Sequence, residues 1–378
     1  MDKHIQKWFS VIFCAILIST MIICLVKPTA TFSENENRYL AKLPVFSAES
    51  LLSGEFTKQI EKYSTDQFPF RSGIVSLKAH AEKLLGKKES GGVFFASDGY
   101  LIEKPSSDNL NILSSNINSI NKLSSLGYNT SVALVPTAFE IHCDKLPYGA
   151  YTPVQKDAAN LASKLCSQSN VNFIDPTSTL DAHKNEYIYF RTDHHQTSNG
   201  SYLVYKHLCE KLNIDAYDES EFTKLDLSDE FYGTMWSKAP LFDTSPDTIS
   251  IYEPNFNIDY EVKYVAENKV SDSLYEKSWL DKKDKYAMFL DANHPIVQIS
   301  SSNKNGKKLA VFKDSYANSI IPFLSLHYEE LYIIDLRYFN TNPISYLDEN
   351  NIDDVLVLYN TSNFISDTNP AKLGAFIK

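Results

Sequence analysis

Apolar residues in the middle of the chain alternate between helical spacing and short uninterrupted runs. From residue 110 to residue 123, leucine and isoleucine recur every three or four positions, which predicts an amphipathic helix. The run SVALV at 131–135 follows and is closed by a proline, as expected of a buried strand. Residues 158–165 then predict a second helix, and residues 172–175 a second strand.

The same alternation returns toward the C-terminus. Residues 201–212 have helical spacing, with Thr197 or Ser198 available as the N-cap. A strand, a helix and two further strands are then predicted at 309–312, 318–327, 331–336 and 355–359. Strand–helix–strand connections of this length predict an α/β fold, with a mainly parallel sheet between helices.

Two regions do not follow this alternation of helices and strands. Residues 214–300 are rich in Tyr and Asp and have no clear periodicity, which predicts loops and irregular strands, either an insertion or a substrate-facing subdomain. Residues 51–88 predict helices, and the short apolar runs on either side of Ser97-Asp98-Gly99 predict a hairpin.

The N-terminus is strongly apolar. Residues 8–26 carry no charge over a length that spans a bilayer, and Lys3 and Lys7 precede them, which places the N-terminus in the cytoplasm. A cleaved signal peptide is the alternative, although no A-x-A site follows. We therefore expect a cytoplasmic tip and transmembrane signal-anchor at 1–27, a stalk at 28–50 and an extracytoplasmic domain at 51–378. Cleavage would instead give a secreted protein.

Charge and cysteine content exclude several classes of protein. A net charge of −11 argues against a nucleic-acid-binding protein, because phosphate neutralisation needs clustered Lys and Arg. The five cysteines have no close spacing, so they predict neither a zinc knuckle nor a disulfide framework.

Candidate chemistry lies at the turn KDSYAN, residues 313–318, between a predicted strand and a predicted helix. A serine that emerges directly after a buried strand is well placed to act as a nucleophile, and that serine is Ser315. Backbone N–H groups of the turn would stabilise a developing oxyanion. The alternative is that Asp314 or Ser315 only caps the helix.

A base and its orienting acid are available in the stretch TDHHQTSN, residues 192–199. In D-x-H spacing, the carboxylate of Asp193 can reach the Nδ1–H of His195 while Nε2 faces outward, and His194 points elsewhere. Two histidines in an ordinary polar loop are the alternative. Together with Ser315, however, the stretch predicts a Ser-His-Asp triad.

Three other meanings of Asp-His-His are disfavoured. A zinc or manganese site needs further ligands, and only His183 is near in sequence. Phosphoesterases with this tripeptide need additional aspartate motifs and normally act in the cytosol. Palmitoyltransferases have a cysteine where Gln196 stands, and they have several membrane spans. We therefore expect neither a metal nor a cofactor.

The stretch YFRTDHHQT at 189–197 resembles the motif of the DHHW proteins, Gram-positive relatives of the alginate O-acetyltransferase accessory proteins. Further stretches agree in the same order. FSENENR at 32–38 resembles the family's E-N-R-x-L-x-x-x-P opening, DQFPFR at 66–71 its D-x-F-P-x-R element, and Asp314-Ser315-Tyr316 its serine block.

The resemblance implies an SGNH-hydrolase-like, flavodoxin-like domain with permuted motif order, since the D-x-H lies 120 residues before the serine. Ser315 is then the nucleophile, His195 the general base and Asp193 its partner. Such relatives accept an acyl group, often from a multi-spanning membrane acyltransferase, and pass it to a polysaccharide hydroxyl.

Two positions depart from the family pattern: Gln196 replaces a tryptophan, and Lys313 replaces the glycine of G-D-S. The second change leaves open how the turn supplies its oxyanion donor. The residues considered for oxyanion or substrate contacts are Asn318, Tyr316, Arg191 and His194. For Arg191 and for Arg337, the stronger expectation is an ion pair with Asp193 or Asp335.

The sequence thus predicts a membrane-anchored extracytoplasmic O-acyltransferase that acts on a cell-envelope or exported polysaccharide. The alternatives are a carbohydrate esterase that uses the same triad and a non-catalytic polysaccharide-binding or assembly factor with an unused site.

Overall fold

The computed structural model describes residues 3–33, 38–105 and 110–377. Residues 34–37, which hold most of the predicted E-N-R opening, lie outside the described residues.

An eight-stranded sheet forms the centre of the α/β part. Its strands, in spatial order, are β11 (Lys269–Ser271), β10 (Tyr260–Tyr264), β12 (Ile296–Ser301), β14 (Glu330–Ile334), β13 (Lys308–Lys313), β15 (Asp354–Asn360), β6 (Asn129–Val135) and β7 (Asn172–Ile174).

The sheet is mixed. The five strands from β14 to β7 are parallel, whereas β12, β10 and β11 continue the sheet antiparallel beyond β14. These three strands come from residues 260–301, inside the stretch for which we predicted only loops and irregular strands. Their alternation is short: in β10 only Val262 and Tyr264 are fully buried, and charged residues occupy the other face.

The parallel strands have a doubly wound order. If β13, β14, β15, β6 and β7 are counted from one to five, their spatial order is 2-1-3-4-5, which is the flavodoxin-like order entered at its fourth strand. The direction of winding reverses between β13 and β15. Ligands of open α/β sheets bind at such a switch point, beyond the carboxyl ends of the strands.

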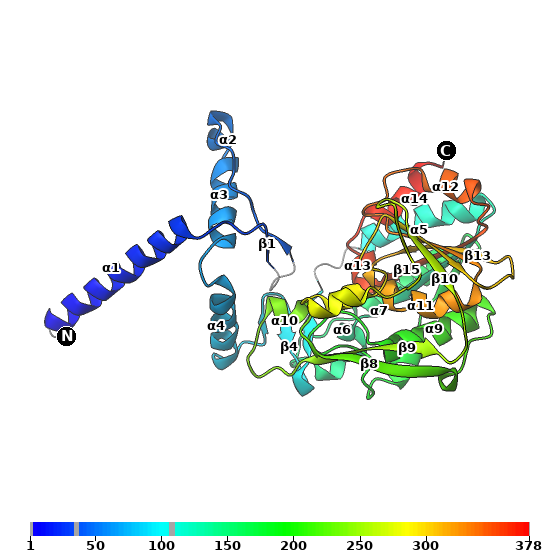
Figure 1. Cartoon of the computed structure of the whole chain (residues 1–378), viewed down its shortest axis with the longest axis horizontal. Coiled ribbons are helices and arrows are strands. Elements are labelled where there is room, and N and C mark those ends of the chain that lie inside the picture. Colours follow the sequence, from blue (N-terminus) through cyan, green and yellow to red (C-terminus); the bar gives the residue numbers. More distant parts are fainter. Residues whose placement is uncertain (1–2, 34–37, 106–109, 378) are drawn as a thin grey trace.

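Helices cover both faces of the sheet (Figure 1). On one face α5 (Leu110–Ser125), α7 (Val154–Cys166), α13 (Thr361–Phe364) and α14 (Lys372–Ala375) pack together. On the other lie α9 (Ser198–Leu212) and α11 (Ile321–Leu324). The helix predicted at 318–327 is broken into the 3₁₀ helix η6 (Ser315–Ser319), α11 and η7 (Ser325–His327).

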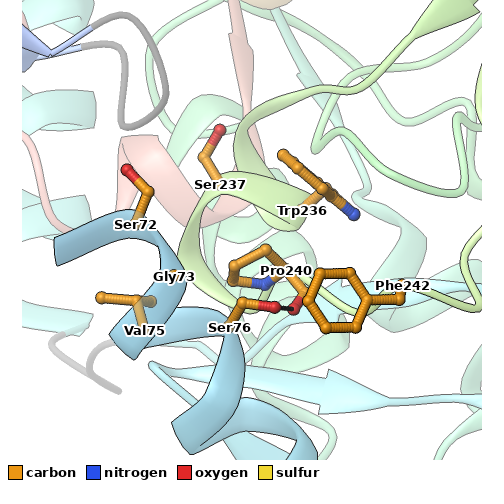
Figure 2. Close-up of a pocket in the computed structure, with 8 residues that line it drawn as sticks. All are labelled: Ser72, Gly73, Val75, Ser76, Trp236, Ser237, Pro240 and Phe242. Atoms are coloured by element: carbon orange, nitrogen blue, oxygen red, sulfur yellow. Dashed lines mark hydrogen bonds between the residues drawn. The ribbon is translucent and has the colours of Figure 1, made fainter. Parts of the chain in front are cut away.

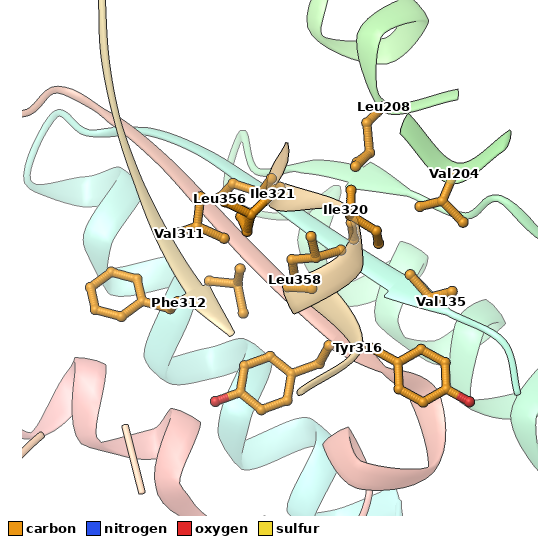
Figure 3. Packing of buried hydrophobic residues seen from close by; sticks show 14 of the residues in the cluster. Val135, Val204, Leu208, Val311, Phe312, Tyr316, Ile320, Ile321, Leu356 and Leu358 are labelled. Carbon is orange, nitrogen blue, oxygen red and sulfur yellow. The ribbon is translucent and has the colours of Figure 1, made fainter. Parts of the chain in front are cut away.

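The core is densest around the two central strands (Figure 3). Val311 and Phe312 of β13 and Leu356 and Leu358 of β15 are fully buried, because parallel strands are covered on both faces. Each such side chain contributes roughly 1.5–3 kcal/mol on burial. The packing therefore fixes the point at which β13 ends and the turn at residues 314–319, the serine turn, begins.

Smaller elements surround the sheet. The predicted hairpin is present, with β4 (Val93–Phe95) antiparallel to β5 (Leu101–Glu103). β8 (Phe222–Phe231) pairs with β9 (Asp247–Pro254), and α10 (Thr234–Lys238) lies between them in sequence. The remaining elements of this part are β3 (Glu89–Ser90), η1 (Ser97–Gly99), α6 (Ala138–Ile141), η2 (Cys143–Lys145), α8 (Thr177–Ala182), η3 (Glu219–Glu221), η4 (Lys277–Asp281), η5 (Lys285–Met288), α12 (Pro343–Glu349) and η8 (Asn369–Ala371).

The N-terminal part is helical and extends from the α/β part (Figure 1). Among the described residues, the segment Gln6–Cys24 of α1 (Lys3–Val26) is the one that is long and apolar enough to cross a membrane. It is followed by β1 (Phe32–Ser33), β2 (Arg38–Tyr39), α2 (Ala48–Leu52), α3 (Glu55–Asp66) and α4 (Arg71–Leu84).

Candidate active site

Ser315 is the first residue of η6, directly after β13. The preceding Asp314 caps this turn, since its Oδ1 accepts the Tyr316 N–H at 3.0 Å. Its Oδ2 accepts from the backbone and side chain of Asn360, at 3.0 and 2.7 Å, and from Asn363 Nδ2 at 2.9 Å. Asp314 thus caps the turn and connects it to the end of β15, and the Ser315 hydroxyl remains available for another partner.

That partner is His195. Its Nε2 lies 2.8 Å from Ser315 Oγ, and its Nδ1 lies 2.6 Å from Asp193 Oδ1. Asp193 and His195 are both buried, at 3% and 5% exposure. The structure therefore brings together the three residues for which the sequence predicted a triad, in the order Ser–His–Asp.

The second carboxylate oxygen of Asp193 is held by α10. Its Oδ2 accepts from Thr234 N at 2.7 Å and from Thr234 Oγ1 at 2.8 Å. Gly233 lies so close that a Cβ at this position would come within 2.2 Å of Asp193 Cβ and 2.4 Å of its Oδ2. Only glycine therefore leaves space for the carboxylate in this orientation.

Burial and charge set the protonation states of the pair. Burial alone would raise the pKa of Asp193, but His194, His195 and the Thr234 N–H together hold the pKa of that carboxyl well below its usual range. Burial, assisted by the charge of His194, lowers the pKa of His195 to about 4. At neutral pH the imidazole is therefore uncharged, as a general base must be.

Tyr286, in η5, covers the imidazole. Its ring stacks on His195 with centroids 3.6 Å apart and an interplanar angle of 8°. Its hydroxyl is 2.9 Å from the Ser315 carbonyl oxygen, to which it donates, and 3.0 Å from Ser319 Oγ. One side chain thus contacts both the base and the serine turn.

The segment that follows η5 has an unusual backbone. Leu290, Asp291 and Ala292 all have positive φ, between 54° and 76°, a conformation that costs roughly 1–2 kcal/mol for each non-glycine residue. Such strain persists only where surrounding contacts enforce it. Here Asn318 Nδ2 donates to the Ala292 carbonyl at 3.2 Å, and Lys313 Nζ donates to Asn293 Oδ1 at 2.7 Å.

Lys313 and Asn318, which flank Ser315 in sequence, therefore both connect the serine turn to the segment that follows Tyr286. Lys313 is fully buried, and burial lowers its pKa to about 8. Its Nζ lies 3.8 Å from Asp335, which forms the expected bidentate ion pair with Arg337, at 2.6 and 2.9 Å. Lys313, which stands where the family pattern has glycine, is therefore held by Asn293 and Asp335.

Gln196, the other departure from the family pattern, is also buried. Its Nε2 donates to the Tyr316 carbonyl at 3.0 Å, while its Oε1 has no partner within the described part of the chain. The Tyr316 hydroxyl in turn donates to the His194 carbonyl. These two bonds connect the loop at residues 192–197, the base loop, to the serine turn.

The remaining predicted contact residues lie around the pair. His194 is a quarter exposed, its Nδ1 is 2.6 Å from Thr234 Oγ1, and it lines a narrow cleft with Glu103 and Asn363. The Arg191 guanidinium lies over the ring of Tyr187 at 4.8 Å and does not form the expected ion pair. The side-chain N–H groups of Asn318 point to the 292–293 backbone and side chain, and its Oδ1 has no partner among the described residues.

Asp193, His194 and His195 are also the one group of metal-ligand type found among the described residues, with their ligand atoms within 4.8 Å of one another. Both nitrogens of His195 are hydrogen-bonded, to Asp193 and Ser315, and His194 Nδ1 is bonded to Thr234. His183, the extra ligand considered from the sequence, instead pairs with Glu186 at 2.7 Å. These hydrogen bonds occupy three of the four imidazole nitrogens of His194 and His195.

Several residues of the site were not predicted from the sequence. Asn360 follows a predicted strand, and its position at the carboxyl end of that strand is a signal that could have identified it. Thr234 and Tyr286 lie in the stretch without periodicity, where no local pattern marks them. Asp247 is buried and accepts from the backbone N–H groups of Arg191 and Thr192, at 2.9 and 2.7 Å, which supports the base loop from beneath.

Comparison with known proteins identifies the family of this chain. The family model described as DHHW protein matches residues 91–334. A crystal structure of a DHHW family protein from Eubacterium siraeum is 28% identical, with a TM-score of 0.65, and the match covers 75% of this chain and 95% of that one.

Two further structures are more distant. Bacillus cereus PatB1, solved with a sulfonyl adduct, is 21% identical with a TM-score of 0.62, over 73% of this chain and 97% of that one. The O-acetyltransferase domain of Pseudomonas putida AlgJ is 15% identical with a TM-score of 0.47, over 75% and 99% of the two chains. No curated protein sequence matches the chain.

The family model covers more than half of the chain and includes both the base loop and the serine turn. This chain belongs to the DHHW protein family.

Proposed function

We propose that the chain is an SGNH-hydrolase-like O-acyltransferase that transfers an acyl group, in the first instance acetyl, to a hydroxyl of a cell-envelope or exported polysaccharide. One observation carries the proposal: Ser315 Oγ, His195 and Asp193 form a continuous chain of hydrogen bonds at 2.8 and 2.6 Å. These three hydrogen-bonded residues lie at the switch point of the sheet, where open α/β folds bind their ligands.

The reaction proceeds in two steps through an acyl-serine. His195 Nε2 takes the proton of Ser315 as Oγ attacks the acyl carbonyl, and returns it to the leaving group. A sugar hydroxyl then gives its proton to His195 and attacks the acyl-serine, and the released serine is reprotonated. Asp193 holds the imidazole in the tautomer with Nδ1 protonated and stabilises the imidazolium.

The serine turn is suited to stabilise the oxyanion. Among the described residues, the backbone N–H of Ser315 has no hydrogen-bond acceptor, and it starts a helical turn. An N–H in this position can donate to the developing negative charge, an interaction worth roughly 2.7–4 kcal/mol per donor in acyl-transfer sites.

The strand order supports the SGNH-hydrolase-like assignment. Ser315 follows the first strand of the 2-1-3-4-5 order, while the base loop follows the last strand, β7, although it comes earlier in the chain. A circular permutation of a flavodoxin-like domain accounts for this motif order.

We further propose that residues 1–27 form a signal-anchor, that 28–50 are a stalk and that 51–378 work outside the cytoplasm, with the stretch 214–300, part of which joins the central sheet, facing the substrate. The apolar α1 supports this division, and a cleaved signal peptide is the alternative. Anchoring would hold the site near a multi-spanning membrane acyltransferase, the acyl donor that the family resemblance implies.

The test is hydrolysis of p-nitrophenyl acetate by the full-length chain in detergent. Wild type should release nitrophenolate, and Ser315→Ala and His195→Ala should each lose that activity. His183→Ala, which changes a half-buried histidine that pairs with Glu186 and not with the triad, is the matched control and should keep it. Equal turnover by wild type and both site variants would leave a non-catalytic binding factor as the better description.

Transferase and esterase are separated by adding an oligosaccharide acceptor and measuring the products. A transferase should convert the nitrophenyl ester into acetylated glycan at the expense of free acetate. If free acetate stays the only product at saturating acceptor, the chain is an esterase.

A further inference from the structure

Helix α4 carries an apolar stripe that nothing in the described structure covers. Ile74, Leu77 and Leu84 are 48%, 68% and 89% exposed, and Leu85, just after the helix, is 80% exposed. At 100° per residue these four positions fall within an arc of roughly 100°, so they lie along one face. An exposed stripe of this kind marks an interaction surface.

The opposite face of α4 is already in use. Ser76 Oγ donates to the Pro240 carbonyl at 2.9 Å (Figure 2). Lys83 pairs with Asp243 at 2.8 Å. At 100° per residue, this face lies roughly 150° from the centre of the apolar stripe. The stripe therefore points away from the α/β part, and the catalytic domain does not cover it.

The start of α4 is held close to the end of α1. Gln67, between α3 and α4, exchanges hydrogen bonds with the backbone of Ala30, at 3.0 and 2.8 Å. Asp66 pairs bidentately with Arg38, at 2.6 and 2.9 Å. Ala30 lies four residues beyond Val26, so the junction is within roughly 14 Å of the end of α1. A membrane that holds α1 must pass close to α4.

Two phenylalanines project at this junction. Phe70 is 75% exposed and has φ of 57°, a left-handed conformation that is costly for a residue with a side chain. Phe68 is 39% exposed. An exposed aromatic ring in a strained conformation gains nothing in water, whereas aromatic rings are favoured at the membrane–water interface.

The charges around the stripe fit an anionic surface. Residues 71–88 hold five basic residues and one acidic residue, so the segment is basic even though Lys83 pairs with Asp243 on the opposite face and the whole chain has a net charge of −11. Lys27 and Arg71 line a cavity of about 400 Å³ beside Phe68 and Phe70. A basic helix with one apolar face is typical of elements that lie in the headgroup region of anionic membranes.

We infer that α4, with Phe68 and Phe70, is a docking element that lies in the headgroup layer of an anionic phospholipid membrane. One face of this helix packs against the catalytic domain, and the opposite face contacts the bilayer. This inference rests on the proposed anchor α1, and it adds a second contact that fixes the height and orientation of the catalytic domain above the lipid.

The test uses the full chain in vesicles of phosphatidylglycerol and phosphatidylcholine. In a Cys14→Ser, Cys24→Ser, Cys143→Ser background, an environment-sensitive dye is attached at Leu77→Cys. The matched control carries the dye at Lys164→Cys, an exposed position on α7. The emission at position 77 should shift to the blue, with quenching by lipid-borne spin labels about threefold or more above that at position 164.

Equal emission and equal quenching at the two positions would overturn the inference. A blue shift at position 77 that follows the protein-to-lipid ratio without lipid quenching would overturn it in favour of a second copy of the chain. Alkaline washing separates the two proposals: protein that washes off the vesicles contradicts the anchor itself, whereas retained protein with an unshifted position 77 contradicts only the docking element.

A second variant tests the role of Phe70. Phe70→Gly removes the ring and relieves the left-handed strain, so the free energy of unfolding should not fall. Quenching at position 77 should nevertheless decrease. Quenching that is unchanged in Phe70→Gly would remove the ring from the docking element.

Discussion

The base loop and the serine turn each contain a buried aspartate, and the two carboxylates are used in opposite ways. Asp193 faces two imidazoles and has its pKa lowered, whereas burial raises the pKa of Asp314, whose partners are amide groups. Asp193 therefore acts through its charge on His195. Asp314 acts as a hydrogen-bond acceptor that shapes the turn.

The two regions also differ in what positions them. The serine turn is positioned by its own strand and by the neighbouring β15, both buried in the core. The base loop is held by residues from distant segments, among them Thr234, Asp247 and Tyr286. The nucleophile thus depends on the core of the sheet, and the base depends on the segment around it.

The largest expected effect on activity comes from removing the charge of Asp193. Asp193→Asn should lower kcat/KM by about 10⁴-fold, because the amide favours the wrong imidazole tautomer. Asp314→Asn should lower kcat/KM less than tenfold. Steady-state kinetics with p-nitrophenyl acetate measure both, and equal losses in the two variants would contradict the assigned difference.

A smaller loss of activity is expected when the Asp193 carboxylate is crowded without a change in its charge. The Cβ of Gly233→Ala would displace Asp193, which should reduce kcat/KM about 10²-fold. Gly73→Ala is the control, since a Cβ there meets nothing within 4 Å and its φ is not positive. It should keep activity and raise the free energy of unfolding by roughly 0.4–1 kcal/mol in denaturant titration. Full activity in Gly233→Ala would mean that the carboxylate position is not critical.

The pH profile tests the base directly. His195 has a pKa of about 4, so its imidazole is neutral above that pH and protonated below it. Activity should therefore be level from pH 5 to pH 7 and fall about tenfold per pH unit below 4. Asp314→Asn should show the same profile. A midpoint near 6.5, the value of a free imidazole, would contradict the effect of burial.

Asp314→Asn, the variant with the smallest expected effect on activity, should clearly lower the stability of the fold. Asp314→Asn removes the Oδ2 acceptor shared by Asn360 and Asn363, which should lower the free energy of unfolding by about 2 kcal/mol. Chemical denaturation monitored by circular dichroism measures this change. A variant as stable as wild type would show that Asp314 is not the structural member of the pair.

The serine turn could be predicted from sequence because its rules are local. A buried run ending in Lys313, an N-capping Asp314 and a following turn are all adjacent in the chain, and the structure has them in that order. The helix predicted after it was wrong in its continuity: η6 ends at Ser319, and a new helical segment, α11, begins at Ile321 with Pro322 in its first turn.

The surroundings of the base loop could not be predicted in the same way. Thr234 and Tyr286 reach the site through the fold of residues 214–300, whose strands are short and polar on one face. The positive φ of Leu290 could not be predicted either, because no local sequence pattern favours it over a helical conformation. Such positions are determined by tertiary contacts, and these contacts outweigh local preference.

The permuted strand order has a consequence for biosynthesis. β6 pairs with β15, so that Val135 lies opposite Asn360, and the middle of the sheet is supplied by the last 71 residues of the chain. A growing or partly exported polypeptide therefore cannot close its sheet, or bring the serine turn to the base loop, until residues 308–360 have emerged. Termination between residues 196 and 314 would leave the base loop without the serine turn, so such fragments would lack the proposed site.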